Sequence, residues 1–311
     1  MHDTPWYIND YRAWLEEEAE QGQLDPEERF RRRWAELERK RRIRFRTPSI
    51  IAPRGNPELP RDILQSPVFS VEKAFDHSLT GDEPLRREHV HARFVAGFNQ
   101  HNPQTILYIG PRLTQDHKAV LLGLFDVAAG RSPEDEIAIR PREFGVKVCG
   151  WSRSIYTREK VKHAIEDLRS AQIYRIWGDD AREQPRRIVD HWRHEKRLGV
   201  MYVKLHEDIL HFFRGYNTYL PRRERIRFQS GIPSFMYSFV KSNDCEPDAP
   251  FTVELFYKMS GADTCMSMSE FAKKLRRSLE QLQEAGVIQR FRRSKGEVHI
   301  FKRKKRKSAK R

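Results

Sequence analysis

Residues 251–301 constrain the fold most, because their pattern changes from helical to extended at defined points. Apolar residues recur at helical spacing through Thr252–Ser260, which predicts a first helix. Ser267 with Glu270 three residues later is a capping-box pattern, so a second helix is expected to begin there. Two short β-prone runs then flank Ser294-Lys295-Gly296, which predicts a hairpin. Two helices followed by a β-hairpin are typical of the winged form of helix-turn-helix.

The second expected helix, residues 267–285, combines one apolar stripe with a basic first half. Cations near a helix N-terminus oppose the macrodipole by about 0.3 kcal/mol or more, so folding gives little reason to place them there. A phosphate backbone would give one, whereas the alternative is a solvated basic face with no partner. The candidate DNA-binding residues of this region are Ser267, Ser269, Lys273, Lys274, Arg276, Arg277, Arg290, Arg292, Arg293, Lys295 and His299.

A similar pattern precedes this region. Ala119–Ala128 predicts an apolar helix, Pro141 begins another, and Thr157 is expected to cap a third. Ile173–Trp177 and Val200–Leu205 are predicted strands on either side of a long basic wing. The candidate DNA-binding residues here are Ser152, Arg153, Ser154, Tyr156, Thr157, Arg158, Lys160, Lys162, Arg186 and Arg187. A weak internal repeat, Leu168–Ile173 against Leu282–Val287, favours two tandem winged helices.

Length and charge restrict the classes of function. The chain has 311 residues, enough for two domains, and 59 Lys and Arg against 44 acidic residues, a net charge of +15. This excess indicates a polyanionic partner such as double-stranded DNA. No apolar run approaches the roughly 18 residues of a membrane span, and no signal peptide opens the chain. We therefore expect a cytoplasmic protein without a membrane partner.

The sequence gives no sign of catalysis. Three scattered cysteines favour neither a disulfide scaffold nor a zinc site, and suit a reducing cytosol. No Gly-x-x-x-x-Gly-Lys-[Ser/Thr] phosphate loop is present, so ATP hydrolysis is not expected. We expect no enzyme, no cofactor and no metal.

The predicted class is therefore α+β: two tandem winged helices between a helical extension and a basic tail. The expected parts are a charged helical arm and linker (1–57), a first winged-helix domain (58–215), a second (216–302) and a disordered basic tail (303–311). Thr47–Pro60 is expected to be a linker, 76–103 a loop or insertion, Glu207–Tyr216 a short joining helix and Arg222–Phe228 extended.

Several short runs, in this order and spacing, resemble the TrfA-type replication initiators of broad-host-range plasmids. They are Leu59–Gln65, Cys149–Ser152 with Tyr156-Thr157, Met259–Thr264, Leu282–Ile288, and Val298-His299 before Lys302-Arg303. The resemblance implies two winged-helix domains that bind direct repeats (iterons) in a plasmid origin. It further implies melting of a nearby AT-rich segment, loading of the host replicative helicase, a homodimer, and contact with the host sliding clamp.

The clamp contact has a weak counterpart here. The family's clamp-binding segment, of the Gln-Leu-x-Leu-Phe type, precedes the first winged helix, and no such run stands in 1–58. Leu121–Phe125 looks similar, but it lies in a densely apolar helix and is expected to be core.

Two other functions remain open. His89-Val90-His91 matches the His-hydrophobic-His pattern of rolling-circle nucleases, with Tyr216 or Tyr219 as nucleophile. The polar flanks of that run do not predict a buried strand, which disfavours the nuclease. A transcriptional repressor built on the same modules is the stronger alternative, because winged helices serve many functions.

Overall fold

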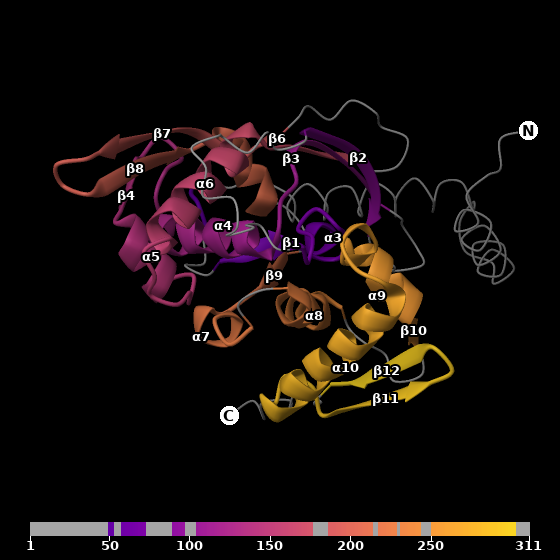
Figure 1. Ribbon diagram of the computed structural model, residues 1–311. Coiled ribbons are helices and arrows are strands. Elements are labelled where there is room, and N and C mark those ends of the chain that lie inside the picture. The colour runs from indigo at the N-terminus through magenta and orange to yellow at the C-terminus, as the bar shows by residue number, and fades with distance from the viewer. Residues whose placement is uncertain are drawn as a thin grey trace, which may run out of the picture.

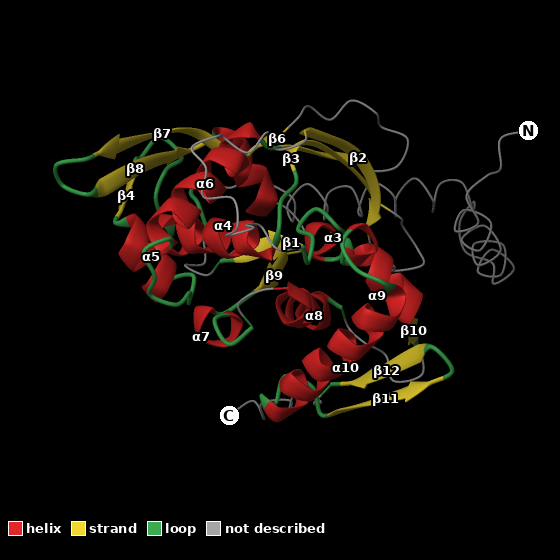
Figure 2. Ribbon diagram, viewed as in Figure 1, coloured by secondary structure: helices red, strands yellow, loops and turns green. Residues whose placement is uncertain are grey.

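The computed structural model describes residues 49–52, 57–72, 89–96, 104–176, 186–213, 217–228, 231–243 and 250–302. The predicted N-terminal arm up to residue 48 and the basic tail from 303 lie outside these residues. Helices and sheets are mixed along the chain, so the α+β class is confirmed (Figures 1 and 2). Within the described part, no helix has the length and apolar character needed to cross a membrane.

The elements up to the middle of the chain are β1 (Glu58–Pro60), α3 (Arg61–Leu64), β2 (His89–Ala96), β3 (Gln104–Pro111), α4 (Gln115–Ala128), β4 (Ile137–Ile139), α5 (Pro141–Lys147), α6 (Thr157–Ser170), β5 (Gln172–Ile176), β6 (Arg186–Arg187), β7 (Val189–Glu195) and β8 (Val200–Leu205). Those that follow are η1 (Glu207–Phe213), β9 (Asn217–Tyr219), α7 (Arg222–Arg225), α8 (Gly231–Ser242), β10 (Phe251–Thr252), α9 (Val253–Met259), η2 (Ala262–Thr264), α10 (Met268–Glu284), β11 (Arg290–Ser294) and β12 (Glu297–Phe301).

Two regions of the chain share one topology. The first, α4-β4-α5-α6-β7-β8, carries a sheet with the strand order β4-β8-β7. The second, α8-β10-α9-α10-β11-β12, carries a sheet with the order β10-β12-β11. Each is a helix, a strand, two helices and a hairpin, with the last strand in the centre of an antiparallel sheet. We call these regions the first unit and the second unit.

An insertion distinguishes the first unit. β5 and β6 lie between α6 and β7 in the chain, but they join β2 and β3 in a sheet of order β2-β3-β5-β6. The predicted pairing of Ile173–Trp177 with Val200–Leu205 around one long wing is therefore wrong. β3 already offers a buried apolar strand for β5, through Ile106 and Tyr108. The true hairpin partner of β8 is β7, which begins at the buried Val189.

The second unit follows its sequence prediction closely. Thr252 Oγ1 accepts a hydrogen bond from the Leu255 amide (3.1 Å), and Ser267 Oγ accepts one from the Glu270 amide (3.3 Å), so both helices begin at capped residues. The predicted stripe of α10 is fully buried: Phe271, Leu275, Leu279 and Leu282 are each 0% exposed. The hairpin turns through Lys295 and Gly296, both with positive φ (47° and 84°), as a two-residue turn requires.

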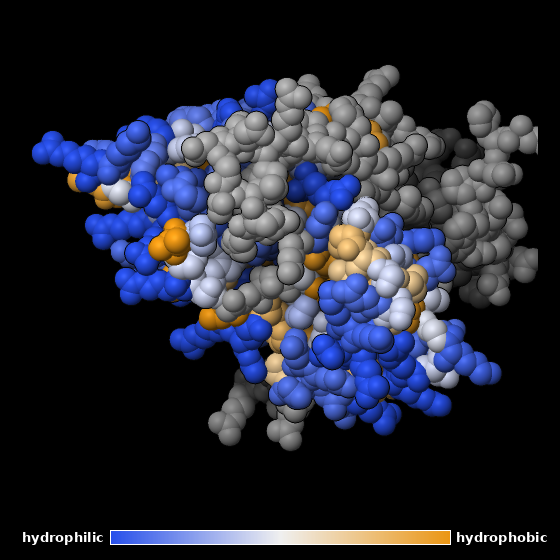
Figure 3. All heavy atoms as spheres, viewed as in Figure 1, coloured by the Kyte–Doolittle hydropathy of each residue, from blue (hydrophilic) through white to orange (hydrophobic). Residues whose placement is uncertain are grey.

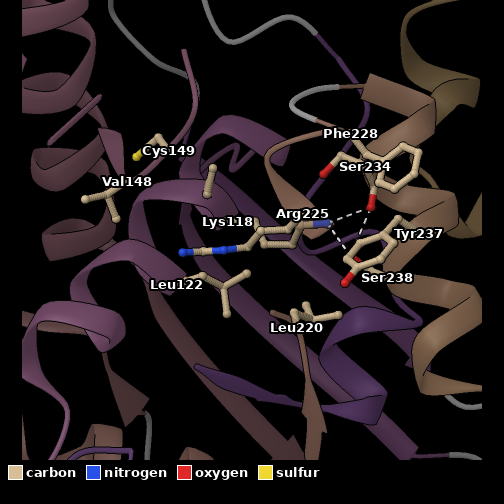
Figure 4. A pocket seen from close by; sticks show the side chains of 11 residues that line it. Lys118, Leu122, Val148, Cys149, Leu220, Arg225, Phe228, Ser234, Tyr237 and Ser238 are labelled. Carbon is tan, nitrogen blue, oxygen red and sulfur yellow. Dashed lines mark hydrogen bonds between the residues drawn. The ribbon is translucent and has the colours of Figure 1, made fainter. Parts of the chain in front are cut away.

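The two units share one continuous hydrophobic core. Lys118 of α4 reaches α8, where its Nζ donates to Ser238 Oγ (2.7 Å) and to the Ser234 carbonyl (3.1 Å), as Figure 4 shows. Burial, and then the nearby Arg225 guanidinium, lower the pKa of Lys118 to about 7. A cavity of about 20 Å³, the volume of roughly one water molecule, lies beside these groups.

A contact between the second unit and the segment at Ser70-Val71, which precedes the first unit, depends on glycine. The Val71 amide donates to the Ser260 carbonyl (2.9 Å), at the turn that ends α9. Gly261 follows with φ +66°, and a Cβ there would lie 2.9 Å from the Ser70 Cβ. A side chain at 261 would therefore be strained by the backbone and by this close packing at once.

Three further sequence predictions are wrong. The expected linker contains Ile51 and Leu59, both 0% exposed. The Ile51 backbone forms hydrogen bonds with Gly130 and Arg131 in the turn after α4, and β1 pairs with β9. The expected loop 76–103 contains β2, which pairs with β3 along its whole length. The polar residues that flank His89-Val90-His91 gave no sign of a strand, because its backbone hydrogen bonds come from β3 and not from a local pattern. The expected extended segment at 222–228 begins with the short helix α7.

The prediction that Leu121–Phe125 is core is confirmed, with Leu121, Leu124 and Phe125 each 0% exposed.

Candidate nucleic-acid interface

The first half of α10 presents four cations, and they are not equivalent. Lys274 Nζ lies 2.6 Å from Glu270 Oε1, and Arg276 Nε donates to Glu280 Oε1 at 2.9 Å. Lys273 and Arg277, one turn apart, are exposed and have no hydrogen bond or ion pair to any described residue. Exposed ion pairs of this kind contribute about 0.5 kcal/mol, so all four cations are available to an anion. Lys273 and Arg277 can bind one without breaking any ion pair to a described residue.

The β11–β12 hairpin divides its basic residues between two faces. Phe291 packs on the core, and Arg293, two residues later on the same face, donates from Nη1 to the Ala272 carbonyl of α10 (3.2 Å). Arg290 and Arg292 lie on the opposite face with their cross-strand partners Phe301 and His299. The Arg290 guanidinium stacks 4.4 Å from the centre of the Phe301 ring. The structure therefore joins Arg293 to the basic half of α10 and places Arg290, Arg292 and His299 apart from it.

Hydrophilic side chains cover this part of the surface. Figure 3 shows them over α10 and the β11–β12 hairpin. Ser267 and Ser269 are exposed at the start of α10, and Lys295 is exposed at the hairpin tip. The predicted residues of the second unit thus form a polar, mostly cationic surface around the N-terminal half of one helix.

In the first unit, a clamped loop precedes α6. Thr157 is buried, and its hydroxyl donates to the Ser152 carbonyl (2.9 Å) and accepts from the Ser154 amide (3.1 Å). The prediction that Thr157 caps the helix is therefore wrong: Tyr156 occupies the N-cap position, and Thr157 fixes the loop instead. The loop leaves Arg153 exposed, and Tyr156 is 48% exposed.

The cations of α6 are neutralised within the protein. Lys160 lies 2.8 Å from Asp116 and stacks over the Trp151 ring, and Lys162 lies 3.0 Å from Glu159. Arg158 contacts the same glutamate at 3.7 Å and His194 at 3.3 Å. Burial, followed by the charges of Lys162 and Arg158, lowers the pKa of His194, so this imidazole adds little positive charge at neutral pH.

Arg186 and Arg187 do not lie beside α6 in a wing, as the sequence suggested. They form β6, which pairs with β5 in the four-stranded sheet. The Arg186 guanidinium is mostly buried, 3.8 Å from the Asp208 carboxylate, whereas Arg187 is exposed. That these two arginines contact the DNA backbone stays a prediction.

Sequence reasoning missed the apolar part of this surface. Ile155, in the clamped loop, is 76% exposed, and Leu198, at the tip of the β7–β8 hairpin, is 57% exposed. Neither residue belongs to a periodic pattern, so only its place in a turn among polar neighbours could have singled it out. Met268, the first residue of α10, is 37% exposed.

Comparisons with known proteins give a distant structural likeness. No family model matches the chain, and no curated protein matches it. The crystal structure of domains 2–3 of RctB superposes with a TM-score of 0.49 at 14% identity, covering 78% of this chain and 97% of that one. A selenomethionine structure of domains 2 and 3 of RctB gives 0.46 at 14% identity, covering 70% and 92%.

Proposed function

We propose that this chain is a sequence-specific DNA-binding protein built from two winged helices, the first unit and the second unit. The observation that carries the proposal is the repeated order of helix, strand, two helices and hairpin with the sheet order first-third-second. In the second unit that frame presents Lys273 and Arg277 on its third helix, and neither side chain has a partner among the described residues. A helix of this kind places its N-terminal residues at base edges in the major groove.

The two units divide the work in this proposal. Lys274 and Lys295 neutralise phosphates and fix the register on the duplex, without reading sequence. Arg276 and Arg277 reach base edges, where an arginine bidentate to guanine is the commonest specific contact. The first unit, whose α6 cations are paired internally, contributes chiefly through its loop and hairpin. No covalent chemistry is involved.

We further propose that the DNA is a set of direct repeats in a plasmid origin, at which the protein initiates replication. The resemblance to TrfA-type initiators supports this. The residues that carry this resemblance include the buried Leu59, Cys149 and Met259, so the resemblance supports a shared fold rather than shared base contacts. Opening of an adjacent AT-rich segment, loading of the host helicase, a sliding-clamp contact and a homodimer belong to the same proposal.

Two experiments test it together. Selection from random duplexes should recover a consensus, and this consensus should recur as tandem repeats beside an AT-rich segment in the DNA around the gene. On supercoiled DNA carrying those repeats, the purified protein should make the AT-rich segment reactive to permanganate. Binding without opening would favour a repressor, and failure to enrich any sequence would contradict specific recognition.

A further inference from the structure

The tip of the β7–β8 hairpin carries an apolar side chain where a polar one is usual. Glu195 pairs with Val200, and the Gly199 amide donates to the Lys196 carbonyl (3.3 Å), so Arg197 and Leu198 are the central residues of the turn. Turns favour Gly, Pro, Asn, Asp and Ser at such positions. Leu198 is 57% exposed and has no place in the hydrophobic core.

The neighbours of Leu198 are cationic. Lys196 and Arg197 are both exposed, and neither side chain forms an ion pair or hydrogen bond with any residue in the described ranges. The two cations keep this tip out of the protein's own core, and the apolar Leu198 side chain gains nothing from bulk water. It matches a nucleic-acid groove, where phosphates line the rim and the floor is formed by bases.

The hairpin is held firmly enough to carry such a tip. Trp192 Nε1 donates to Glu166 Oε2 of α6 (2.7 Å), and Arg193 forms two hydrogen bonds with Glu136 (2.8 and 3.2 Å) while its guanidinium stacks 3.9 Å from the Tyr202 ring centre. β4 pairs with β8 only up to Met201, so the turn extends past the edge of the sheet. In Figure 1 the hairpin projects at the left edge of the molecule.

The second unit provides a matched comparison. Its hairpin also ends the sheet beside the third helix, but its turn is Lys295-Gly296, which offers a charge and no apolar group. The two tips therefore differ in what they can do to DNA. A lysine can only approach a phosphate, whereas a leucine is among the side chains that enter a base step from the minor groove and unstack it.

We propose that Leu198 is a minor-groove wedge: it inserts between two base pairs, with Lys196 and Arg197 against the adjacent phosphates, and kinks the duplex. This rests on the proposed DNA binding and adds a residue that distorts the DNA. Pyrimidine–purine steps such as TA unstack most easily, so the favoured step should be of that type. The ligand class is duplex DNA with a flexible, A·T-rich step.

The test uses the full chain and a duplex recovered from a random pool by that chain, with 2-aminopurine replacing one adenine at a time. Unaltered protein should raise the fluorescence at one step, because unstacking removes quenching. Leu198→Ser should abolish this rise and weaken binding about tenfold, whereas Leu198→Met, also a wedge, should keep most of both. Lys295→Ser is the control, expected to weaken binding while the fluorescence rise stays.

The outcomes separate this inference from the proposed function. If Leu198→Ser binds and raises fluorescence like the unaltered chain, the side chain serves a different partner, such as a protein, and the wedge is overturned while DNA binding stands. A tenfold loss of affinity without any fluorescence rise in the unaltered complex also overturns it. If the unaltered chain enriches no duplex, the proposed function and the wedge fail together.

Discussion

The two units have the same order of elements but differ in how many cations of their third helices are paired within the protein. In α6, Lys160 and Lys162 are each paired with a carboxylate from the protein itself. In α10, Lys273 and Arg277 have no partner among the described residues. Both helices contain four Lys or Arg and three acidic residues, so composition does not distinguish them. What differs is where the acids lie, which decides whether the cations serve the fold or remain for a ligand.

The largest expected effect concerns the unpaired arginine of α10. Arg277→Ala should cost about 1–3 kcal/mol at the selected site and relax the preference at one base pair, because a bidentate guanine contact is lost. Arg276→Ala should behave similarly or more weakly, since Glu280 already holds that side chain in the free protein. Lys162→Ala in α6 is the matched control, expected to change affinity little. Repeating the selection with each variant measures this; an unchanged consensus for both arginine variants would place base reading elsewhere.

The next prediction concerns how tightly the units are joined. The folded-state pKa of Lys118, about 7, lies below the ordinary lysine value of 10.5, so the unfolded chain binds more protons between these pH values. The free energy of unfolding should therefore rise by about 1.5 kcal/mol between pH 7 and pH 8.5, and the same stability is lost when the pH is lowered back to 7. Urea unfolding at several pH values measures it.

The control for that titration is Lys147→Met, which alters an exposed lysine and should keep the slope. Lys118→Met should remove it. A pH-independent stability of the unaltered protein over this range would mean that the Lys118 ammonium stays charged between α4 and α8.

A smaller effect is expected from Lys274. Its ammonium lies against Glu270 in the free protein and contacts a phosphate in the proposed complex. Lys274→Ala should weaken binding to all duplexes and reduce the slope of log K against log salt by about one unit. Binding titrations on the selected duplex and on a scrambled duplex give both quantities. A loss confined to the selected duplex would make Lys274 a reading residue.

The smallest expected effect reverses the contrast between the units. Glu159→Gln removes the carboxylate that holds Lys162 and Arg158, which should free both cations of α6. Because exposed pairs are weak, binding to any duplex should improve only about twofold, and the salt dependence should steepen slightly. Filter-binding measurements on an unselected duplex are sufficient. Weaker binding would show that Glu159 positions those cations rather than withholding them.

The sequence predicted what local patterns control. The stripe and cap of α10, and the turn at Lys295-Gly296, depend on neighbours within a few residues, and all three predictions are confirmed. Predictions that needed distant partners were wrong or missing. The prolines around Ile51 suggested a linker, although the isoleucine packs in the core, and the basic segment 178–199 hid the strand that begins at Val189.

The candidate site shows the same limit. The basic residues of α6 and α10 read alike in sequence, because the acid that neutralises Lys160, Asp116, lies on another helix. The separation of Arg290 and Arg292 from α10 follows from strand alternation once the register is known, and the register was predictable from the turn. Leu198 and Ile155 carried no periodic signal, so only the fold reveals their exposure.

The most direct test of the central claim, that unpaired basic side chains of the second unit bind the DNA backbone and bases, is the salt dependence of duplex binding. Each phosphate neutralised contributes about −0.9 to the slope of log K against log salt, so several contacts predict a slope of roughly −4 or steeper. Lys273→Ala combined with Arg277→Ala should make that slope shallower by about two units. A slope near zero for the unaltered chain, or one that the double variant leaves unchanged, would contradict the account.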